Sequence, residues 1–248
     1  MPQRLGQHFL TNTAALQSIA AAAAPEPGLT ILEIGPGRGA LTRFLLPLCR
    51  RLIAIEVDQV LVHYLEEKFR GEPKFEVIHA DILAAELTGW GPVSVAGNLP
   101  YYITSPIIER TLALGPLLKN AVFLVQKEVA ERITAAPGGR DYGYLSVVCQ
   151  IATEAKYLIT VPPEAFRPPP KVFSAVVQLT PRPQPLVADA KSFLRFASLC
   201  FTQKRKTLRN NLLSTYGSDK LESMPEAKLR AEQLSVERLA DLHRRLET

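Results

Sequence analysis

The stretch LEIGPGRGALT, residues 32–42, decides the fold that we expect of this chain. A short apolar segment at residues 30–34 leads into it and predicts a β-strand. Glycines at positions 35, 37 and 39 then form a GxGxG turn, where glycine allows a positive φ and lets a ligand approach the backbone. Dinucleotide sites usually carry GxGxxG around a bound pyrophosphate. The spacing therefore favours a ligand without a diphosphate, with a plain tight turn as the alternative.

Segments typical of strands and of helices alternate along the chain around this turn. We expect strands at residues 30–34, 51–57, 75–79, 93–96, 121–125, 157–161 and 172–179. Helices are expected through the alanine tract that ends at residue 24 and at residues 40–48, 59–69, 105–114 and 127–134. This alternation predicts βαβ units and a mainly parallel sheet. Only the proline-rich loop at residues 162–170 separates the last two strands, so they are candidates for an antiparallel pair at one edge.

A second domain is predicted after the proline-rich segment PRPQP, residues 181–185, which is typical of a linker. Beyond it the pattern is helical, with apolar residues at helical spacing in residues 193–201 and 234–246. We therefore expect an α/β domain at residues 1–181 that binds the ligand. A small all-helical domain should follow at residues 182–248.

Charge is unevenly distributed between these two parts. The 248 residues are 47% hydrophobic and 21% charged, which is ordinary for a globular protein. The formal net charge is +5, yet residues 1–180 hold 16 basic and 16 acidic residues, so the whole excess lies in the last quarter of the chain. A positive helical domain favours a polyanionic partner, and a solvated helix face is the alternative.

Composition excludes several classes of protein. No segment approaches the ~18 apolar residues of a membrane span, and polar residues interrupt the N-terminal stretch, so we expect neither a membrane partner nor export. Cys49, Cys149 and Cys200 lie far apart among apolar neighbours, and the four histidines lack metal-ligand spacing. We therefore expect a cytoplasmic protein without disulfides or a metal, whose cysteines are small core residues.

Two carboxylates follow the next strands along the chain. Glu56 ends the second strand 21 residues after Gly35, near the ~20-residue offset at which an acid meets ribose hydroxyls. Asp81 follows the third strand, where it can accept a hydrogen bond from an adenine amino group; helix capping by Asp81 and Asp58 is the alternative. Ligands of open α/β sheets bind at this carboxyl edge. The combination predicts an adenosine-containing cofactor.

The segment NLPYYIT, residues 98–104, follows the fourth strand and suits chemistry on a planar amine. The lone pair of an adenine amine is delocalised into the ring, which makes the nitrogen a poor nucleophile. Acceptors on the Asn98 side chain and the Leu99 carbonyl would bind both N–H groups and aim the lone pair at an electrophile. Pro100 would stiffen the turn and Tyr101 would stack on the base, whereas a bare turn is the alternative.

Together these motifs resemble class I S-adenosylmethionine-dependent methyltransferases that act on adenine N6. More narrowly, the chain resembles the KsgA family of small-subunit (16S) ribosomal RNA adenine N6,N6-dimethyltransferases. The resemblance runs nearly end to end, through LGQHFL (5–10), LEIGPGRGALT (32–42), EVD (56–58), ADIL (80–83), NLPYYIT (98–104), QKEVAERI (126–133), YGYLSV (142–147), FRPPPKVFSAVV (166–177) and KRKTLRNNL (204–212). It implies a Rossmann-like fold with a seven-stranded, mainly parallel sheet and a small all-helical C-terminal domain. It also implies dimethylation of two adjacent adenosines in the 3′-terminal stem-loop of small-subunit rRNA, within a pre-30S particle during ribosome assembly.

The resemblance further implies the residues of the site. S-adenosylmethionine, with S-adenosylhomocysteine as the product and no metal, is expected at His8, Leu10, Gly35, Gly37, Glu56, Asp81, Ile82 and Asn98. Catalysis is expected at Asn98, Leu99, Pro100, Tyr101 and Phe166, with Tyr101 and Phe166 flanking the target base; core packing is the alternative for Phe166. His8 is a departure because many relatives have Asn there, although an imidazole can also donate a hydrogen bond. We expect a monomeric enzyme.

A basic cluster in the last quarter of the chain is expected to contact RNA. Four of its cations fall within six residues, and no acidic residue occurs between Asp189 and Asp219. Such clusters suit phosphate contacts, whose affinity falls with salt. With further cations beside the active site, the expected RNA-binding residues are Arg132, Arg140, Arg167, Lys171, Lys204, Arg205, Lys206 and Arg209.

Three other functions remain alternatives at this point. A large-subunit rRNA adenine methyltransferase of the macrolide-resistance type would share the cofactor core, but the FRPPPKV and KRKTLRNNL segments favour the small-subunit branch. A ribosome-assembly binding factor, or a transcription factor like the mitochondrial relatives, would depend on docking rather than catalysis. An NAD oxidoreductase is disfavoured by the glycine spacing.

Overall fold

The computed structural model describes residues 8–247 and falls into two compact units. One unit consists of the described residues up to Ala130 together with Ala155–Pro181, and the other of Glu131–Glu154 and the described residues from Arg182 onward. The compact units differ from the predicted division at residue 181, because residues 131–154 pack with the C-terminal helices. The assignment of a cofactor-binding and an RNA-binding domain stays a prediction.

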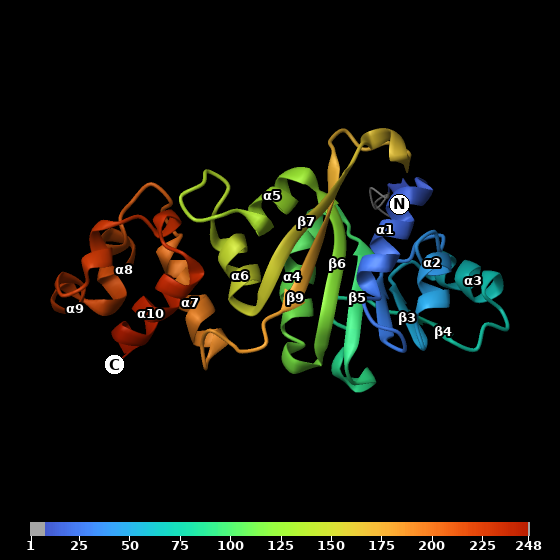
Figure 1. Ribbon diagram of the computed structural model, residues 1–248, viewed down its shortest axis with the longest axis horizontal. Helices are drawn as coiled ribbons and strands as arrows, with labels where there is room; N and C mark the ends of the chain where they lie inside the picture. Colours follow the sequence, from blue (N-terminus) through green and yellow to red (C-terminus); the bar gives the residue numbers. More distant parts are fainter. Residues whose placement is uncertain (1–7, 248) are drawn as a thin grey trace. The chain divides into compact units, whose positions relative to one another are not determined.

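The first unit is built on a seven-stranded sheet with the order β4-β3-β2-β5-β6-β9-β7 (Figure 1). Its strands are β2 (Thr30–Ile34), β3 (Arg51–Glu56), β4 (Phe75–His79), β5 (Val93–Asn98), β6 (Leu118–Gln126), β7 (Thr153–Val161) and β9 (Ser174–Pro181). The five strands from β4 to β6 in this order pair in parallel, whereas β9 runs antiparallel to β6 and β7 lies beside it at the edge. The predicted mainly parallel α/β sheet is confirmed.

The register of the central strands brings the predicted motifs to one edge. All five residues of β2 are buried, as expected of a parallel strand covered on both faces. Ile34 at its end pairs with Ile55 of β3 and Gly97 of β5. The residues that follow these three positions, Gly35, Glu56 and Asn98, therefore lie at the same carboxyl edge.

The helices of this unit include α1 (Thr13–Ala23), α2 (Thr42–Leu45), α3 (Gln59–Lys68) and α4 (Thr104–Leu112), and α5 (Lys127–Thr134) is divided between the two units. Helix α1 is capped at its N-terminus, because the Asn12 side chain accepts a hydrogen bond from the Ala15 N–H at 2.9 Å. Leu16 and Ile19 of α1 pack in a core cluster with Ala96 and Val122 of the sheet. Helix α4 also packs against β6, on the opposite face of the sheet (Figure 1).

Some sequence-based expectations about local structure were wrong. The helix expected at residues 40–48 is only the short α2 followed by a 3₁₀ turn, Leu46–Leu48, with Pro47 at its start. A two-stranded antiparallel sheet of β1 (Phe9–Leu10) and β8 (Phe166–Arg167) was not predicted, since two residues carry no alternation pattern. Helix α6 (Tyr144–Ala152) was also missed, because its sequence is nearly all apolar and shows no polar face.

The second unit is helical over its C-terminal part, as predicted. Besides α6 it contains α7 (Ala190–Cys200), α8 (Leu208–Tyr216), α9 (Ser218–Glu222) and α10 (Val236–Glu247). Phe193 and Phe196 of α7 are fully buried in its core, together with Tyr142 and Leu239. These side chains belong to a core cluster distinct from the one that contains Leu16 and Val122.

Two further expectations concern composition. Cys49, Cys149 and Cys200 are all buried, so their predicted place in the core is confirmed. Within residues 8–247, none of the helices is both long enough and apolar enough to cross a membrane.

Candidate active site

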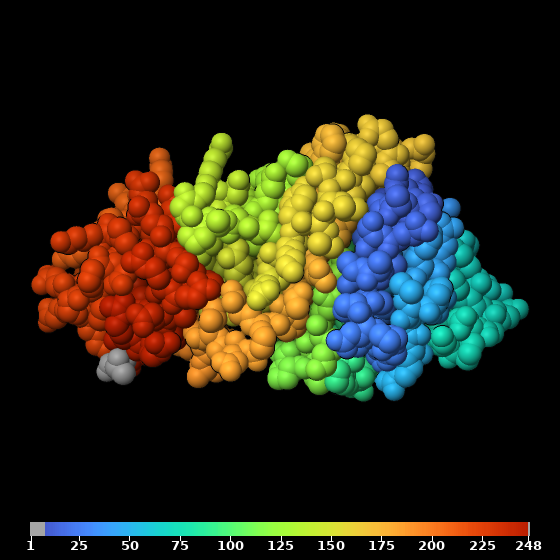
Figure 2. All heavy atoms as spheres, viewed as in Figure 1, coloured from blue at the N-terminus to red at the C-terminus, as the bar shows by residue number. Residues whose placement is uncertain are grey.

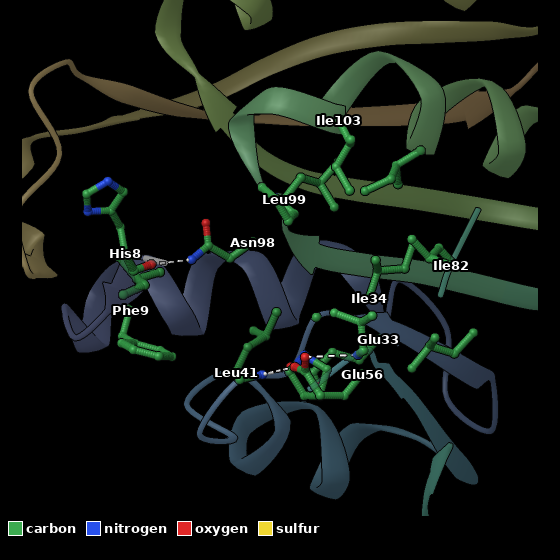
Figure 3. A pocket seen from close by; sticks show the side chains of 18 of the residues that line it. His8, Phe9, Glu33, Ile34, Leu41, Glu56, Ile82, Asn98, Leu99 and Ile103 are labelled. Atoms are coloured by element: carbon green, nitrogen blue, oxygen red, sulfur yellow. Dashed lines mark hydrogen bonds between the residues drawn. The ribbon is translucent and has the colours of Figure 1, made fainter. Parts of the chain in front are cut away.

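A cavity of about 290 Å³ opens at the carboxyl edge of β2, β3 and β5 (Figure 3). Its wall is mainly apolar, with a few polar groups that converge on it, which is the usual character of a ligand site. The residues that the sequence predicted for this site and that line the cavity are His8, Leu10, Gly35, Gly37, Glu56, Asp81, Ile82, Asn98, Leu99, Pro100 and Tyr101. The structure thus brings these residues together, while what each of them binds stays a prediction.

The glycine turn forms one wall because its backbone needs glycine. Gly35 and Gly37 have φ values of 64° and 57°, in the left-handed region that other residues rarely adopt. A Cβ at Gly37 would also lie 3.0 Å from the Phe9 ring, whereas a Cβ at Gly35 would meet open space. The backbone at Gly35 is therefore directly accessible to a molecule in the cavity.

Glu56 is a buried carboxylate held in a fixed orientation by the backbone. It is 3% exposed, and one oxygen accepts from the Gly37 N–H at 3.1 Å. The other accepts from the N–H groups of Val57 and Asp58 at 3.0 and 3.1 Å. An ionised carboxylate has about four acceptor positions, so Glu56 retains capacity for a hydroxyl donor in the cavity.

Asp81 lies on the far side of the cavity from β5 and has two functions in the structure. Its carboxylate accepts from the Leu83 N–H at 2.9 Å, so it caps the turn after β4, whereas the alternative interpretation expected a helix there. The residue is exposed and lines the cavity, and therefore the cap does not prevent contact with a ligand. The next residue, Ile82, is buried and adds an apolar wall.

Asn98 is oriented by a contact with the N-terminal strand segment. Its side-chain N–H group donates to the His8 carbonyl at 2.9 Å. This hydrogen bond assigns the amide orientation, so that the side-chain oxygen is directed away from His8 and remains an acceptor (Figure 3). The following residue, Leu99, is buried and its N–H donates to the Leu124 carbonyl at 3.0 Å, which fixes the start of the NLPY turn on the sheet.

Tyr101 provides an aromatic wall beside Asn98. Its hydroxyl forms a 2.7 Å hydrogen bond with the Ser174 hydroxyl, and its ring stacks on the His8 ring with centroids 6.0 Å apart. Burial raises the pKa of the Tyr101 phenol, so the ring stays neutral at physiological pH. The His8 ring is fixed in turn by a 2.8 Å hydrogen bond between Nδ1 and the Pro168 carbonyl.

Phe166 is not among the residues that line the cavity. Its side chain is fully buried in the core with Leu16 and Val161, while its backbone pairs with Leu10. Pairing of β8 with β1 turns this side chain inward. This geometry does not favour a position of the Phe166 ring beside the target base. That role of Phe166 stays a prediction.

Glu33 is a site residue that the sequence reasoning missed. It is 1% exposed, lines the floor of the cavity and accepts a 2.7 Å hydrogen bond from the Thr42 hydroxyl. Burial raises the pKa of this carboxyl to about 7, because it outweighs the opposing effect of Thr42. A charged residue inside the apolar strand TILEI was the signal that would have identified it.

Comparison with known proteins agrees with this geometry. Residues 2–247 match the family model described as Ribosomal RNA adenine dimethylase. The chain belongs to the ribosomal RNA adenine dimethylase family. Similar curated proteins include Ribosomal RNA small subunit methyltransferase A of Hydrogenovibrio crunogenus, which is 43% identical over 95% of this chain and 92% of the relative. The protein of the same name from Acidobacterium capsulatum is 42% identical over 98% of this chain and 90% of its own length. The predicted family resemblance is confirmed.

Solved structures of similar proteins share the fold of this dimethylase. A dimethyladenosine transferase from Plasmodium falciparum superposes with a TM-score of 0.83 at 27% identity, covering 95% of this chain and 96% of the other. The 23S rRNA methyltransferase ErmE has a TM-score of 0.77 at 32% identity, covering 97% of this chain and all of the other. The class I methyltransferase fold predicted from the sequence is thereby confirmed.

The cations predicted to bind RNA are divided between the two units of this dimethylase. Arg167 and Lys171 are exposed in the first unit. The second unit holds Arg132, Arg140, Lys204, Arg205, Lys206 and Arg209. Lys204 donates to the Arg140 carbonyl at 2.5 Å and lies 3.6 Å from Glu232, so part of this cluster is also engaged within the protein. RNA binding by these residues stays a prediction.

No metal-binding arrangement is apparent in the described residues. Within residues 8–247, no three His, Cys, Asp or Glu side chains form a group that could hold an ion. The polar groups around the cavity include the Glu56 and Asp81 carboxylates and the Asn98 amide, which are held by backbone hydrogen bonds. Their donor and acceptor pattern suits an organic ligand with hydroxyl and amino groups.

Proposed function

We propose that this chain transfers methyl groups from S-adenosylmethionine to N6 of two adjacent adenosines in the 3′-terminal stem-loop of small-subunit rRNA. The products would be N6,N6-dimethyladenosine and S-adenosylhomocysteine. The observation that carries the proposal is the orientation of Asn98, whose oxygen remains an acceptor at the cavity because its N–H group donates to His8. Membership of the rRNA adenine dimethylase family supports the same reaction.

The residues around the cavity fit S-adenosylmethionine. The accessible backbone at Gly35 permits close approach, and the fixed Glu56 carboxylate can accept from ribose hydroxyls. Asp81 would accept from the adenine amino group, with Ile82 against the ring. His8 and Leu10 would meet the methionine end, since they lie at the same cavity on β1 or beside it.

The chain's own residues orient the target amine and surround it. When bound, S-adenosylmethionine supplies an electrophilic methyl group on a sulfonium. The Asn98 oxygen accepts from the N6–H of the target and, with the Leu99 carbonyl, directs the nitrogen lone pair toward that methyl group. The Tyr101 ring stacks on the base and helps to exclude water. In this transfer a bond from N6 to the methyl carbon would replace the sulfur–carbon bond, S-adenosylhomocysteine would leave, and the proton that N6 gives up would pass to solvent.

A neutral amide at position 98 is compatible with dimethylation. The Asn98 oxygen is an acceptor toward either an NH₂ or an NHCH₃ group, because it needs only one N–H donor. The same contact therefore serves both transfers to one nitrogen. The family description, a dimethylase, supports this interpretation.

The names of the relatives favour the small-subunit substrate. Curated relatives at 42–43% identity are called small subunit methyltransferase A, whereas ErmE, a 23S rRNA methyltransferase, is 32% identical. We propose further that the enzyme is a monomer that acts on a pre-30S particle in the cytoplasm. The basic cluster of the second unit would contact phosphates of the rRNA.

The decisive experiment is mass analysis of rRNA after incubation of isolated 30S and 50S particles with the protein and labelled S-adenosylmethionine. We expect two methyl groups on each of two adjacent adenosines in the 30S rRNA and none in the 50S rRNA. Absence of label in both, or label in 50S particles alone, would overturn the proposal. Complementation by an Asn98→Ala protein separates an enzyme from a docking factor, since only a docking factor tolerates that change.

A further inference from the structure

Two exposed aromatic rings lie next to the segment that holds Tyr101. Tyr102 is 65% exposed and Phe173 is 51% exposed, and Val172 beside it is 44% exposed. Large apolar side chains of this kind are usually buried, and a group of them at the surface indicates a binding site. None of the steps proposed above uses these three side chains.

The two rings are attached to segments that a hydrogen bond joins. Tyr101 and Ser174 form the 2.7 Å hydroxyl contact described above, and Tyr102 and Phe173 are their immediate neighbours in the chain. The Phe173 carbonyl accepts from the Lys127 N–H at 2.9 Å, which anchors its backbone between β6 and β9. Tyr102 also lines the cavity. The backbones are therefore held in place while both rings are exposed to solvent, that of Tyr102 at the edge of the cavity.

Two exposed cations lie in the chain segment that precedes Phe173. Arg167 and Lys171 are exposed in the segment that leads to Phe173, and this segment lies at the surface in the space-filling view, where it is coloured gold (Figure 2). Exposed rings beside cations are the typical surface for unpaired nucleotides, because bases stack on the rings and phosphates pair with the cations. A protein partner would favour a broader apolar patch with fewer charges.

We propose that Tyr102 and Phe173 stack on the unpaired bases that flank the target adenosine in the RNA. This inference rests on the proposed function, because the target base must enter the cavity beside Asn98 and Tyr101. Its neighbours in the strand then leave the cavity at the edge where Tyr102 lies. Stacking there would keep the strand unpaired and hold the target in place, and it would contribute affinity for RNA without contacting the cofactor.

The test compares Tyr102→Ala and Phe173→Ala with the wild-type protein on 30S particles. Each ring should contribute a stacking interaction, so we expect each alanine variant to raise the KM for RNA about tenfold. Tyr102→Phe and Phe173→Tyr keep a ring and should stay within about twofold of the wild type. Tyr64→Ala is the matched control, because Tyr64 is 46% exposed on α3 and does not line the cavity.

Three further measurements distinguish this inference from general damage and from failure of the proposed function. Affinity for S-adenosylmethionine should be unchanged in Phe173→Ala, because Phe173 does not line the cavity, and the melting temperature should be unchanged in both alanine variants. A 2-aminopurine placed beside the target pair should be quenched by the wild-type protein and less by Tyr102→Ala. Unchanged KM and quenching in the alanine variants, with an active wild type, would overturn the stacking surface alone. An inactive wild type would overturn the proposed function.

Discussion

The side-chain amide of Asn98 donates a 2.9 Å hydrogen bond to the main-chain carbonyl of His8, a residue 90 positions earlier in the chain. His8 is itself anchored, because its Nδ1 lies 2.8 Å from the Pro168 carbonyl and its ring stacks on Tyr101. The orientation of the predicted catalytic amide therefore depends on contacts among three segments. This relationship gives the His8 side chain a function that does not require contact with the cofactor.

Replacing His8 should affect the methyl-transfer step. In His8→Ala the anchor to Pro168 is lost, and the loss of one neutral hydrogen bond, about 1 kcal/mol, should slow single-turnover transfer about fivefold. His8→Asn retains a side-chain N–H donor and should recover most of the rate. Single-turnover assays with saturating S-adenosylmethionine measure this effect. Equal rates in wild type and His8→Ala would show that Asn98 is oriented without the anchor.

Removal of the Asn98 amide should abolish transfer while the cofactor still binds. One positioned hydrogen-bonding group at a reacting centre typically raises kcat about 10²- to 10³-fold. We therefore expect kcat of Asn98→Ala to fall by at least that factor. Calorimetric titration should give an affinity for S-adenosylmethionine close to that of the wild type, because the contacts of Glu56 are intact in the variant. Turnover at the wild-type rate would contradict the assigned role.

Glu33 should make the stability of the protein depend on pH. Burial raises its pKa from 4.5 to about 7 in the folded state, so the folded protein retains a proton that the unfolded chain releases between these values. The contribution of the raised Glu33 pKa to the free energy of unfolding is therefore fully present below pH 4.5 and is lost as the pH rises through 7. The shift corresponds to about 3 kcal/mol in the free energy of unfolding.

The matched variant for this prediction is Glu33→Gln, which keeps an acceptor for the Thr42 hydroxyl but cannot ionise. Urea unfolding at pH 5 and pH 8 should show that the wild type loses about 2–3 kcal/mol more than the variant over this range. Parallel pH profiles of the two proteins would mean that the Glu33 carboxyl is not protonated in the folded state near neutral pH.

The burial of Phe166 predicts the effect of its replacement on the free energy of unfolding. The residue is fully buried in the core of the first unit, so Phe166→Ala should lower the free energy of unfolding by about 3–5 kcal/mol. Phe166→Leu, which leaves a smaller cavity, should cost less and keep methyl transfer at low temperature. Loss of transfer in Phe166→Leu without a change in melting temperature would instead support a role beside the target base.

The sequence predicted best those features that depend on the residue types within one strand and on which residue ends that strand. Strand β4 was predicted with its observed bounds, and Glu56 and Asn98 lie at strand ends on one cavity because parallel strands share a carboxyl edge. What it missed depends on contacts between distant segments. The pairing of β1 with β8 and the inward direction of Phe166 arise from residues more than 150 positions apart, which no local pattern encodes.

The basic cluster of the second unit should determine the salt dependence of RNA binding. Lys204, Arg205 and Lys206 are all exposed, and each phosphate contact contributes about 0.7–0.9 to the slope of log K against log salt concentration. Changing the three together to Ala should reduce that slope by about 2–3 and weaken binding at low salt. Arg50 and Lys74, exposed cations at the amino ends of β3 and β4, provide a double-alanine control that should leave the slope unchanged. An equal loss of slope in the control would indicate a diffuse charge effect, whereas an unchanged slope in the triple variant would exclude the cluster from the RNA interface.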